Sequence, residues 1–276
     1  MIATVARAFA LAFLVGAAPG PAPALQATDD PAASVMWQKV RANLFQDRAI
    51  TPAPAGMLTL EAPTRAIDAA TVPIAISARF PQTPERYVRK IYLIIDANPS
   101  PISAIFGFTP ESGRVGIETR VRVDAYSHVR AIAEMNDGQL YATTRFVKAS
   151  GGCSAPAGVD AQAALASLGK MRLRVEGDLK GRDPVRAELL INHPNHSGLA
   201  MDQYTRQFTP AHYVRNVEVT YAGKPVFSAD VDFSISENPN FRFYFQPQSQ
   251  GALRVSVVDT RDLRFELADA LRPASP

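Results

Sequence analysis

The chain has 276 residues, of which 47% are hydrophobic and 20% charged, and its formal net charge is +3. This composition excludes a chain kept disordered by excess charge. The positive charges form no Lys/Arg block and no basic stripe interleaved with aromatic residues, so nucleic-acid binding is not expected. The length fits one large or two ordinary globular domains.

The first 27 residues have the pattern of a signal peptide. Arg7 precedes an apolar run from Ala8 to Ala18, and small residues in an A-x-A arrangement follow as far as Ala27. The apolar run is about half of the roughly 20 residues that a membrane-spanning helix needs. A cleaved signal is therefore favoured over a membrane anchor. We expect residues 1–27 to be removed and the mature protein to be periplasmic, with no membrane insertion after cleavage.

A short amphipathic helix is predicted between Ser34 and Gln46. Trp37, Val40 and Leu44 fall at i, i+3 and i+7 there, which places them on one helix face. We expect Trp37 to anchor this helix as a packed side chain rather than to stack on a ligand.

The rest of the chain alternates with the period of two that half-buried strands show, and Pro, Gly and Asn turns separate the segments. Expected strands are 57–61, 72–78, 88–96, 104–108, 115–123, 128–134 and 139–148, then 171–176, 185–192, 213–221, 225–231, 241–245, 252–258 and 263–267. Seven short strands at this spacing are typical of an immunoglobulin-like sandwich. The predicted fold is therefore all-β, with sandwich domains at 34–148 and 169–272 and a linking arm at 149–168.

The arm carries Cys153, the one cysteine of the chain, in the run Gly151-Gly152-Cys153-Ser154. An exported protein meets an oxidising compartment, and a single cysteine cannot form an internal disulfide. Gly151 and Gly152 are expected to make the arm flexible and to leave the thiol accessible, as a covalent carrier requires. The alternative is a small buried residue, which is how free cysteines often behave. Periodic apolar neighbours would favour that alternative, and the arm has none.

Other chemistry has weaker support in the sequence. His193 and His196 are three residues apart in a loop without a nearby third ligand in zinc spacing, so no metal site is predicted. The nucleophile elbow, the phosphate-binding loop and the dinucleotide fingerprint are all missing from the sequence. No cofactor is expected, and the chain is not expected to be an enzyme. The enzymatic alternative would pair Cys153 with a distant histidine, His128 or His212 included.

The second half resembles SoxZ, a subunit of sulfur oxidation, across roughly residues 169–270. The resemblance lies in Ile191-Asn192-His193-Pro194, Pro210-Ala211-His212-Tyr213-Val214, Val217-Glu218-Val219, Val226-Phe227-Ser228-Ala229-Asp230 and Ile235-Ser236-Glu237-Asn238-Pro239, in that order.

The first half resembles SoxY. It ends in Gly151-Gly152-Cys153, the tripeptide that carries the sulfur in that family, and it shares Trp37, Pro63-Thr64-Arg65-Ala66 and Val72-Pro73-Ile74. The chain departs from SoxY after the cysteine. Ser154-Ala155-Pro156 follows there in place of Gly-Gly at a chain terminus, so this arm is tethered at both ends.

Together the two halves resemble the fused SoxY–SoxZ proteins described as quinoprotein dehydrogenase-associated SoxYZ-like carriers. The resemblance implies two immunoglobulin-like sandwiches in the periplasm, with Cys153 as the attachment point of a sulfur-containing group. It also implies partners among sulfur-oxidation enzymes, or a quinoprotein dehydrogenase or cytochrome.

Two alternatives stay open at this point. The chain could be a non-covalent scaffold for such a quinoprotein or cytochrome, with the cysteine incidental. Alternatively, Cys153 could sense redox state or link two copies in a disulfide homodimer.

Overall fold

The computed structural model describes residues 30–156, 161–202, 205–247 and 251–270. The predicted signal peptide lies outside the described residues. Within them, strands dominate and two short helices, α1 (Val35–Leu44) and α2 (Ala161–Ala166), flank the sheets. In the same ranges no helix is long and apolar enough to cross a membrane.

Two groups of strands follow one another along the chain. The first group is β1 (Ile50–Pro52), β2 (Leu58–Glu61), β3 (Val72–Ala78), β4 (Val88–Ile95), β5 (Ile102–Phe108), β6 (Val115–Val121), β7 (Ser127–Met135) and β8 (Leu140–Val147), with a 3-10 turn at Pro110–Ser112. The second is β9 (Met171–Glu176), β10 (Val185–Ile191), β11 (Val214–Tyr221), β12 (Lys224–Val231), β13 (Asn240–Phe245), β14 (Ala252–Asp259) and β15 (Arg264–Ala270).

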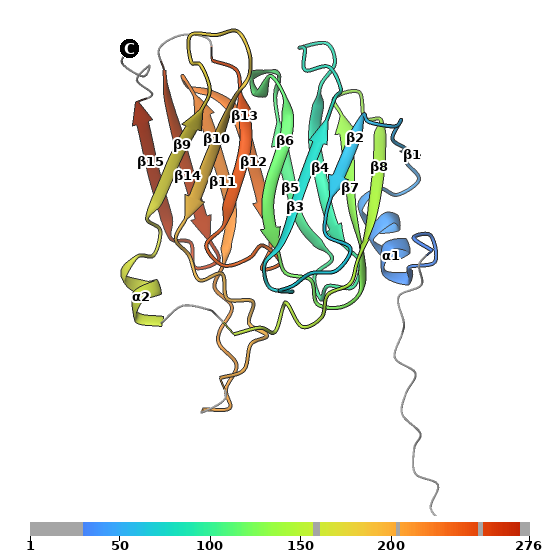
Figure 1. Cartoon of the computed structure of the whole chain (residues 1–276), viewed down its shortest axis with the longest axis vertical. Coiled ribbons are helices and arrows are strands. Elements are labelled where there is room, and N and C mark those ends of the chain that lie inside the picture. Colours follow the sequence, from blue (N-terminus) through green and yellow to red (C-terminus); the bar gives the residue numbers. More distant parts are fainter. Residues whose placement is uncertain (1–29, 157–160, 203–204, 248–250, 271–276) are drawn as a thin grey trace, which may run out of the picture.

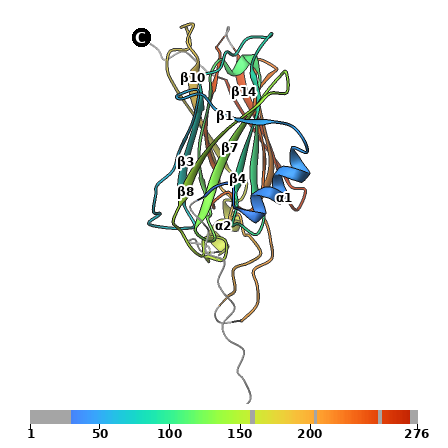
Figure 2. The same cartoon turned by 90° about the vertical axis from the view of Figure 1, so that its right-hand side faces the viewer.

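The strands form two facing sheets that each run through both halves of the chain (Figures 1 and 2). The nine-stranded sheet has the order β1-β8-β7-β4-β5-β12-β11-β14-β15, and the six-stranded sheet has the order β2-β3-β6-β13-β10-β9. The all-β class with two sandwich halves is confirmed, and the structure adds that the sheets are continuous. The boundaries 34–148, 149–168 and 169–272 stay a prediction, because no gap in the sheets marks a domain border.

The seam between the halves is a pair of strand contacts. β5 and β12 pair antiparallel, with Phe108 opposite Phe227 and Phe106 opposite Ala229. On the other sheet, β6 meets β13 where Glu118 and Arg242 are in register, and their side chains form an ion pair at 3.0 Å. This pair is partly exposed and contributes little stability, so the strand pairing and the core hold the seam.

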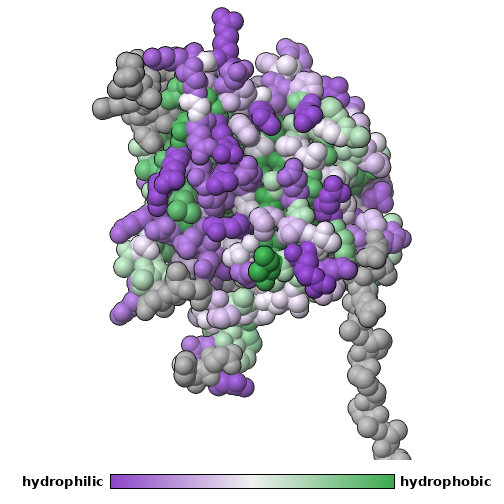
Figure 3. All heavy atoms as spheres, viewed as in Figure 1, coloured by the Kyte–Doolittle hydropathy of each residue, from purple (hydrophilic) through white to green (hydrophobic). Residues whose placement is uncertain are grey.

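One hydrophobic core lies between the sheets and crosses the seam. Phe227 stacks on Phe243 with ring centroids 4.6 Å apart and packs against Phe106 from the first half at 6.1 Å. The alternation that predicted the strands is visible in β3, where residues 72, 74, 76 and 78 are buried. The opposite face of the six-stranded sheet is solvated, and hydrophilic residues gather there over β9, β10 and β13 (Figure 3).

The predicted N-terminal helix is α1, and it covers the outer face of the nine-stranded sheet (Figure 2). The Ser34 hydroxyl caps the helix by accepting a hydrogen bond from the Trp37 amide at 3.2 Å. Val40 is buried against the sheet, and Trp37 is half-buried with the Arg130 guanidinium 4.5 Å from its ring centroid. This cover explains why every residue of β7 is buried.

Fourteen of the strands agree with the predicted segments within a few residues, and β1 was missed. β1 has three residues and ends in Pro52, which is too short for a period-two pattern. It pairs parallel with β8, a contact between distant segments that local periodicity does not report.

Candidate functional site at the cysteine segment

Residues 149–156 lie at the end of the sandwich where the chain crosses from one half to the other (Figure 1). The sequence predicted an accessible thiol on a flexible arm. In the structure Cys153 is a free cysteine with 0% of its surface exposed. The expected exposure is therefore wrong for this conformation, which we call the docked state of the segment.

Hydrogen bonds hold the docked segment to both halves of the molecule. From the first half, the Asp124 carbonyl accepts from the Gly151 amide at 2.7 Å, and the Val123 carbonyl accepts from the Gly152 amide at 3.1 Å. The Cys153 amide donates to Asp124 Oδ1 at 3.3 Å. From the second half, the Ser197 hydroxyl donates to the Cys153 carbonyl at 2.6 Å. The cysteine thus lies at the junction of the two halves, and its backbone is hydrogen-bonded to one residue of each half, Asp124 and Ser197.

The two glycines have different roles in this arrangement. A Cβ on Gly152 would lie 2.1 Å from the Ala69 carbonyl oxygen and 2.7 Å from the Val123 carbonyl oxygen. Gly152 therefore permits close packing of the segment on the first half. Gly151 has a φ of +79° and open space around its Cα, so it supplies the left-handed turn before the cysteine.

The surroundings of Cys153 disfavour its thiolate. Burial raises the pKa of the thiol to about 12, and the nearby Asp124 carboxylate adds to the effect. Arg122 acts in the opposite direction, and Asp232 raises the pKa further. Because the thiolate is the nucleophile, the docked cysteine is protonated and chemically protected.

Arg122 also ties the second half to this site. Its Nη1 donates to the carbonyls of Phe233 and Ile235, each at 2.9 Å, and burial lowers the pKa of its guanidinium. Asn98 donates to the Ser234 hydroxyl at 2.9 Å and accepts from the Asp124 amide at 2.9 Å. The loop after β12 therefore forms part of the wall behind the cysteine segment.

Ser197 belongs to a long excursion between β10 and β11 that projects from this end of the molecule (Figure 1). His196 and His212 pair at its base, each amide donating to the other's carbonyl at 2.8 and 3.0 Å. Farther out, Met201 forms an antiparallel β-bridge with Phe208, which is exposed. We call the described residues 196–202 and 205–212 the projecting hairpin. The hairpin places the Ser197 hydroxyl within hydrogen-bond distance of the Cys153 carbonyl.

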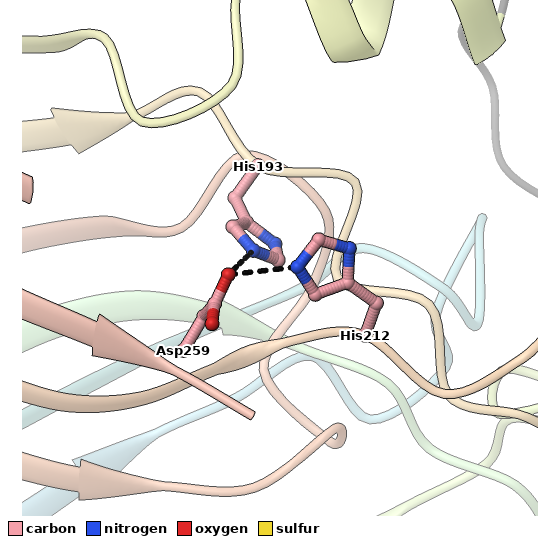
Figure 4. A group of neighbouring side chains, drawn as sticks. All are labelled: His193, His212 and Asp259. Atoms are coloured by element: carbon pink, nitrogen blue, oxygen red, sulfur yellow. Dashed lines mark hydrogen bonds and ion pairs between the residues drawn. The ribbon is translucent and has the colours of Figure 1, made fainter. Parts of the chain in front are cut away.

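A buried cluster of His193, His212 and Asp259 lies at the root of this hairpin (Figure 4). Asp259 Oδ2 is 2.7 Å from His212 Nε2 and 3.5 Å from His193 Nε2. Asp259 Oδ1 accepts from the amides of Arg261 and Leu263. Burial, together with His212, lowers the pKa of His193 to about 4, so His193 is neutral.

The hydrogen bonds of His193 decide what this cluster can do. Its Nδ1 accepts from the Asn195 amide at 3.1 Å, so a neutral ring carries its proton on Nε2, facing Asp259. A metal on Nε2 would need that proton moved to Nδ1, which faces another donor. The cluster therefore fits a carboxylate that fastens the hairpin better than it fits a metal centre. The sequence did not predict it, because its members come from three distant segments.

The enzymatic alternative required a histidine within reach of the sulfur. In the described part of the chain, no hydrogen bond joins Cys153 Sγ to any histidine.

Comparison with known proteins assigns each half to a family. Residues 41–153 match the model of the sulfur oxidation protein SoxY, and residues 173–268 match the model of the sulphur oxidation protein SoxZ. A search of curated protein sequences finds no match.

Solved structures with similar folds include one from the same family. The sulfur carrier protein SoxY from Chlorobium limicola f thiosulfatophilum is 23% identical over 41% of this chain and 94% of its own, with a TM-score of 0.35. A superoxide reductase (neelaredoxin) variant from Ignicoccus hospitalis is 16% identical over 33% of this chain and 78% of its own, with a TM-score of 0.31.

The fold and the family matches define a two-part all-β protein of sulfur oxidation. This chain belongs to the SoxY and SoxZ families and is a fused SoxY–SoxZ protein, as the sequence predicted. Membership of these two families also agrees with the prediction that the chain is not an enzyme.

Proposed function

We propose that this chain is a periplasmic sulfur carrier that holds a sulfur-containing group covalently on Cys153 and presents it to partner enzymes. One observation carries the proposal. The SoxY match ends at residue 153, on the one cysteine of the chain, and the structure has this residue bonded to both halves.

The carrier cycle requires the docked segment to open. The docked thiol is protonated and has no exposed surface, so a partner can reach it only after residues 149–156 leave the body. The hydrogen bonds that must break are few, and the segment contributes only two small side chains, those of Ala149 and Cys153, to the interior. Opening therefore costs far less than unfolding either half.

Loading can proceed by thiol exchange once the segment is open. The Cys153 thiolate attacks a donor R–S–S–R′, a new S–S bond forms between Cys153 and RS, and the donor bond breaks to release R′S⁻. Electrons balance in this step without an outside oxidant. The identity of R is set by the donor.

The test is the mass of the protein taken from its native host. We expect a fraction of the intact mature chain to carry an added sulfur-containing mass that maps to Cys153 and is removed by a thiol reductant. A strain carrying Cys153→Ser should be impaired in sulfur oxidation or in a linked dehydrogenase pathway. Unmodified Cys153 in every preparation, with an unimpaired strain, would refute the carrier. The mature N-terminus from the same spectra tests signal cleavage and export.

The burial of the thiol favours one second candidate, a non-covalent scaffold for a periplasmic quinoprotein dehydrogenase or cytochrome. In that case the cysteine is structural. Capture of partners from periplasmic extract separates the two functions: the scaffold predicts that Cys153→Ser retains the same partner, whereas the carrier predicts loss of partners that bind the loaded group. Non-reducing electrophoresis of the same extract tests for a Cys153-linked homodimer.

A further inference from the structure

The docked segment leaves little room for a substituent on the cysteine. The Cys153 side chain is fully buried, and its backbone is bonded on both sides, to Asp124 and to Ser197. Protein interiors are close-packed, so several added heavy atoms on the sulfur would displace the segment or its walls. Size alone therefore opposes docking of a loaded cysteine.

Charge opposes docking of a loaded cysteine as well. Asp124 presents a carboxylate oxygen to the Cys153 amide, and Asp232 has one buried carboxylate oxygen, Oδ1, without a hydrogen-bond partner in the described structure. Arg122 is the cation that interacts electrostatically with Cys153, and its Nη1 is already shared between two carbonyls of the loop after β12. A negative group attached to the sulfur would lie close to the Asp124 carboxylate, while the Arg122 guanidinium, which offsets that charge, already has its Nη1 hydrogen-bonded to backbone carbonyls.

We infer that the docked site accepts the uncharged thiol and rejects an anionic sulfur group, so that loading of Cys153 releases the cysteine segment from the body. Asp124 is the positioning residue of this selection, because it binds the Cys153 amide and faces the cargo with a negative charge. The inference rests on the proposed carrier function and adds how the charge of the cargo controls the site: a group that carries a negative charge opens it. The discharged thiol returns to the protected state, and the loaded arm remains available to an enzyme.

Two adducts of the full mature chain separate charge from size. Tetrathionate reacts with the Cys153 thiolate to form Cys153–S–S–SO₃⁻ and releases thiosulfate. Butyl methanethiosulfonate forms the neutral Cys153–S–S–C₄H₉, which adds the same number of heavy atoms to the sulfur as the anionic adduct does, and releases methanesulfinate. Both exchanges form one bond to sulfur and break one, and intact mass confirms that each reaction is complete.

Hydrogen exchange at the amides of Gly151, Gly152 and Cys153 reports docking directly, because each of these amides donates a bond that exists only in the docked state. We expect the anionic adduct to lower their protection at least about tenfold more than the neutral adduct does. Amides of β3 serve as the internal control and should not change. Equal protection in the free thiol and the anionic adduct would overturn the inference.

Asp124→Asn tests the residue itself, since an amide oxygen still accepts the Cys153 hydrogen bond while the charge is lost. In this variant, the difference in amide protection between the anionic and the neutral adduct should be about tenfold smaller. Asp183→Asn, on an exposed turn before β10, is the matched control and should leave the difference unchanged. If Asp124→Asn shows the same difference in protection between the adducts as the wild type, Asp124 does not select against anionic groups. These measurements use adducts made in solution, so they are independent of the test of the carrier function. The carrier function can hold while this inference fails, and this inference can hold while Cys153 carries no group in the native host.

Discussion

Gly152 lies where the cysteine segment passes closest to the first half, and the absence of a side chain there allows the thiol to be buried. The carbonyl oxygens of Ala69 and Val123 occupy the space that a Cβ would need. Both are backbone atoms of the sandwich, so they cannot rotate away. The sequence suggests that Gly152 makes the chain flexible, whereas in the structure it allows a close contact with the first half.

Replacing Gly152 with alanine should therefore undock the segment. We expect the rate at which a thiol reagent labels Cys153 in the folded protein to rise at least about tenfold, which corresponds to about 1.4 kcal/mol. Gly151→Ala is the comparison, because it adds left-handed strain of about 1 kcal/mol without a clash and should give a smaller increase. Labelling of Gly152→Ala as slow as that of the wild type would contradict the close packing.

The pKa of Cys153 predicts how docking responds to pH. The docked thiol has its pKa raised to about 12, whereas the pKa of an exposed cysteine is about 8.5. Because its pKa is raised in the docked state, the thiol contributes stability to docking that is fully present below about pH 8.5. This stability is lost as the pH rises from about 8.5 toward the pKa of the docked thiol.

The open fraction of the segment should thus be constant below about pH 8.5 and increase by up to about tenfold per pH unit above it. Hydrogen exchange of the Gly152 amide, corrected for the intrinsic rate, measures this fraction. Cys153→Ser lacks the titrating group and should show a flat profile. A wild-type profile as flat as that of the variant would show that the thiol is not desolvated.

Among the elements, the projecting hairpin links the second half to the cysteine. Its base is fastened by the His193, His212 and Asp259 cluster, and Ser197 reaches from it to the Cys153 carbonyl. Any motion of the hairpin relative to the sheets must stretch that hydrogen bond. The hairpin is therefore the element through which contacts on the SoxZ half can affect release of the thiol on the SoxY half.

Ser197→Ala removes this link and should raise the labelling rate of Cys153 by about fivefold to tenfold, the size of one buried hydrogen bond of about 1 kcal/mol. Ser154→Ala is a matched control, since Ser154 is exposed and donates only to Gly151 in its own segment at 3.3 Å. Equal labelling rates in the two variants would mean that the hairpin does not hold the segment.

Local patterns in the sequence predicted the elements well and their long-range contacts poorly. The alternation in β3 and the stripe of α1 depend on neighbours in sequence, so both could be predicted. The site at Cys153 depends on Asp124 and Ser197, which lie 29 and 44 residues away. No sequence pattern near Asp124 or Ser197 links them to the cysteine. The small residues around Cys153 predicted a flexible arm because the residues that pack against them are distant in sequence.

At the scale of the whole molecule, the halves share their sheets and their core. Separating them would leave β5 and β12 as unpaired edges and would expose Phe106 and Phe227 at the seam. Exposed apolar edge strands promote association with other chains. The two halves should therefore depend on each other for stability, although each matches its own family.

A protease site inserted between Pro156 and Ala161 tests this dependence with the complete protein. After cleavage we expect the two fragments to stay together as one 1:1 complex in size-exclusion chromatography with light scattering. They should unfold in a single cooperative transition, because the seam does not require the covalent link. Each fragment expressed alone, ending at 156 or beginning at 157, should aggregate or lack a cooperative transition, and mixing during expression should restore the complex. Two monodisperse fragments that melt independently and do not bind each other would show that the continuous sheets contribute nothing to stability.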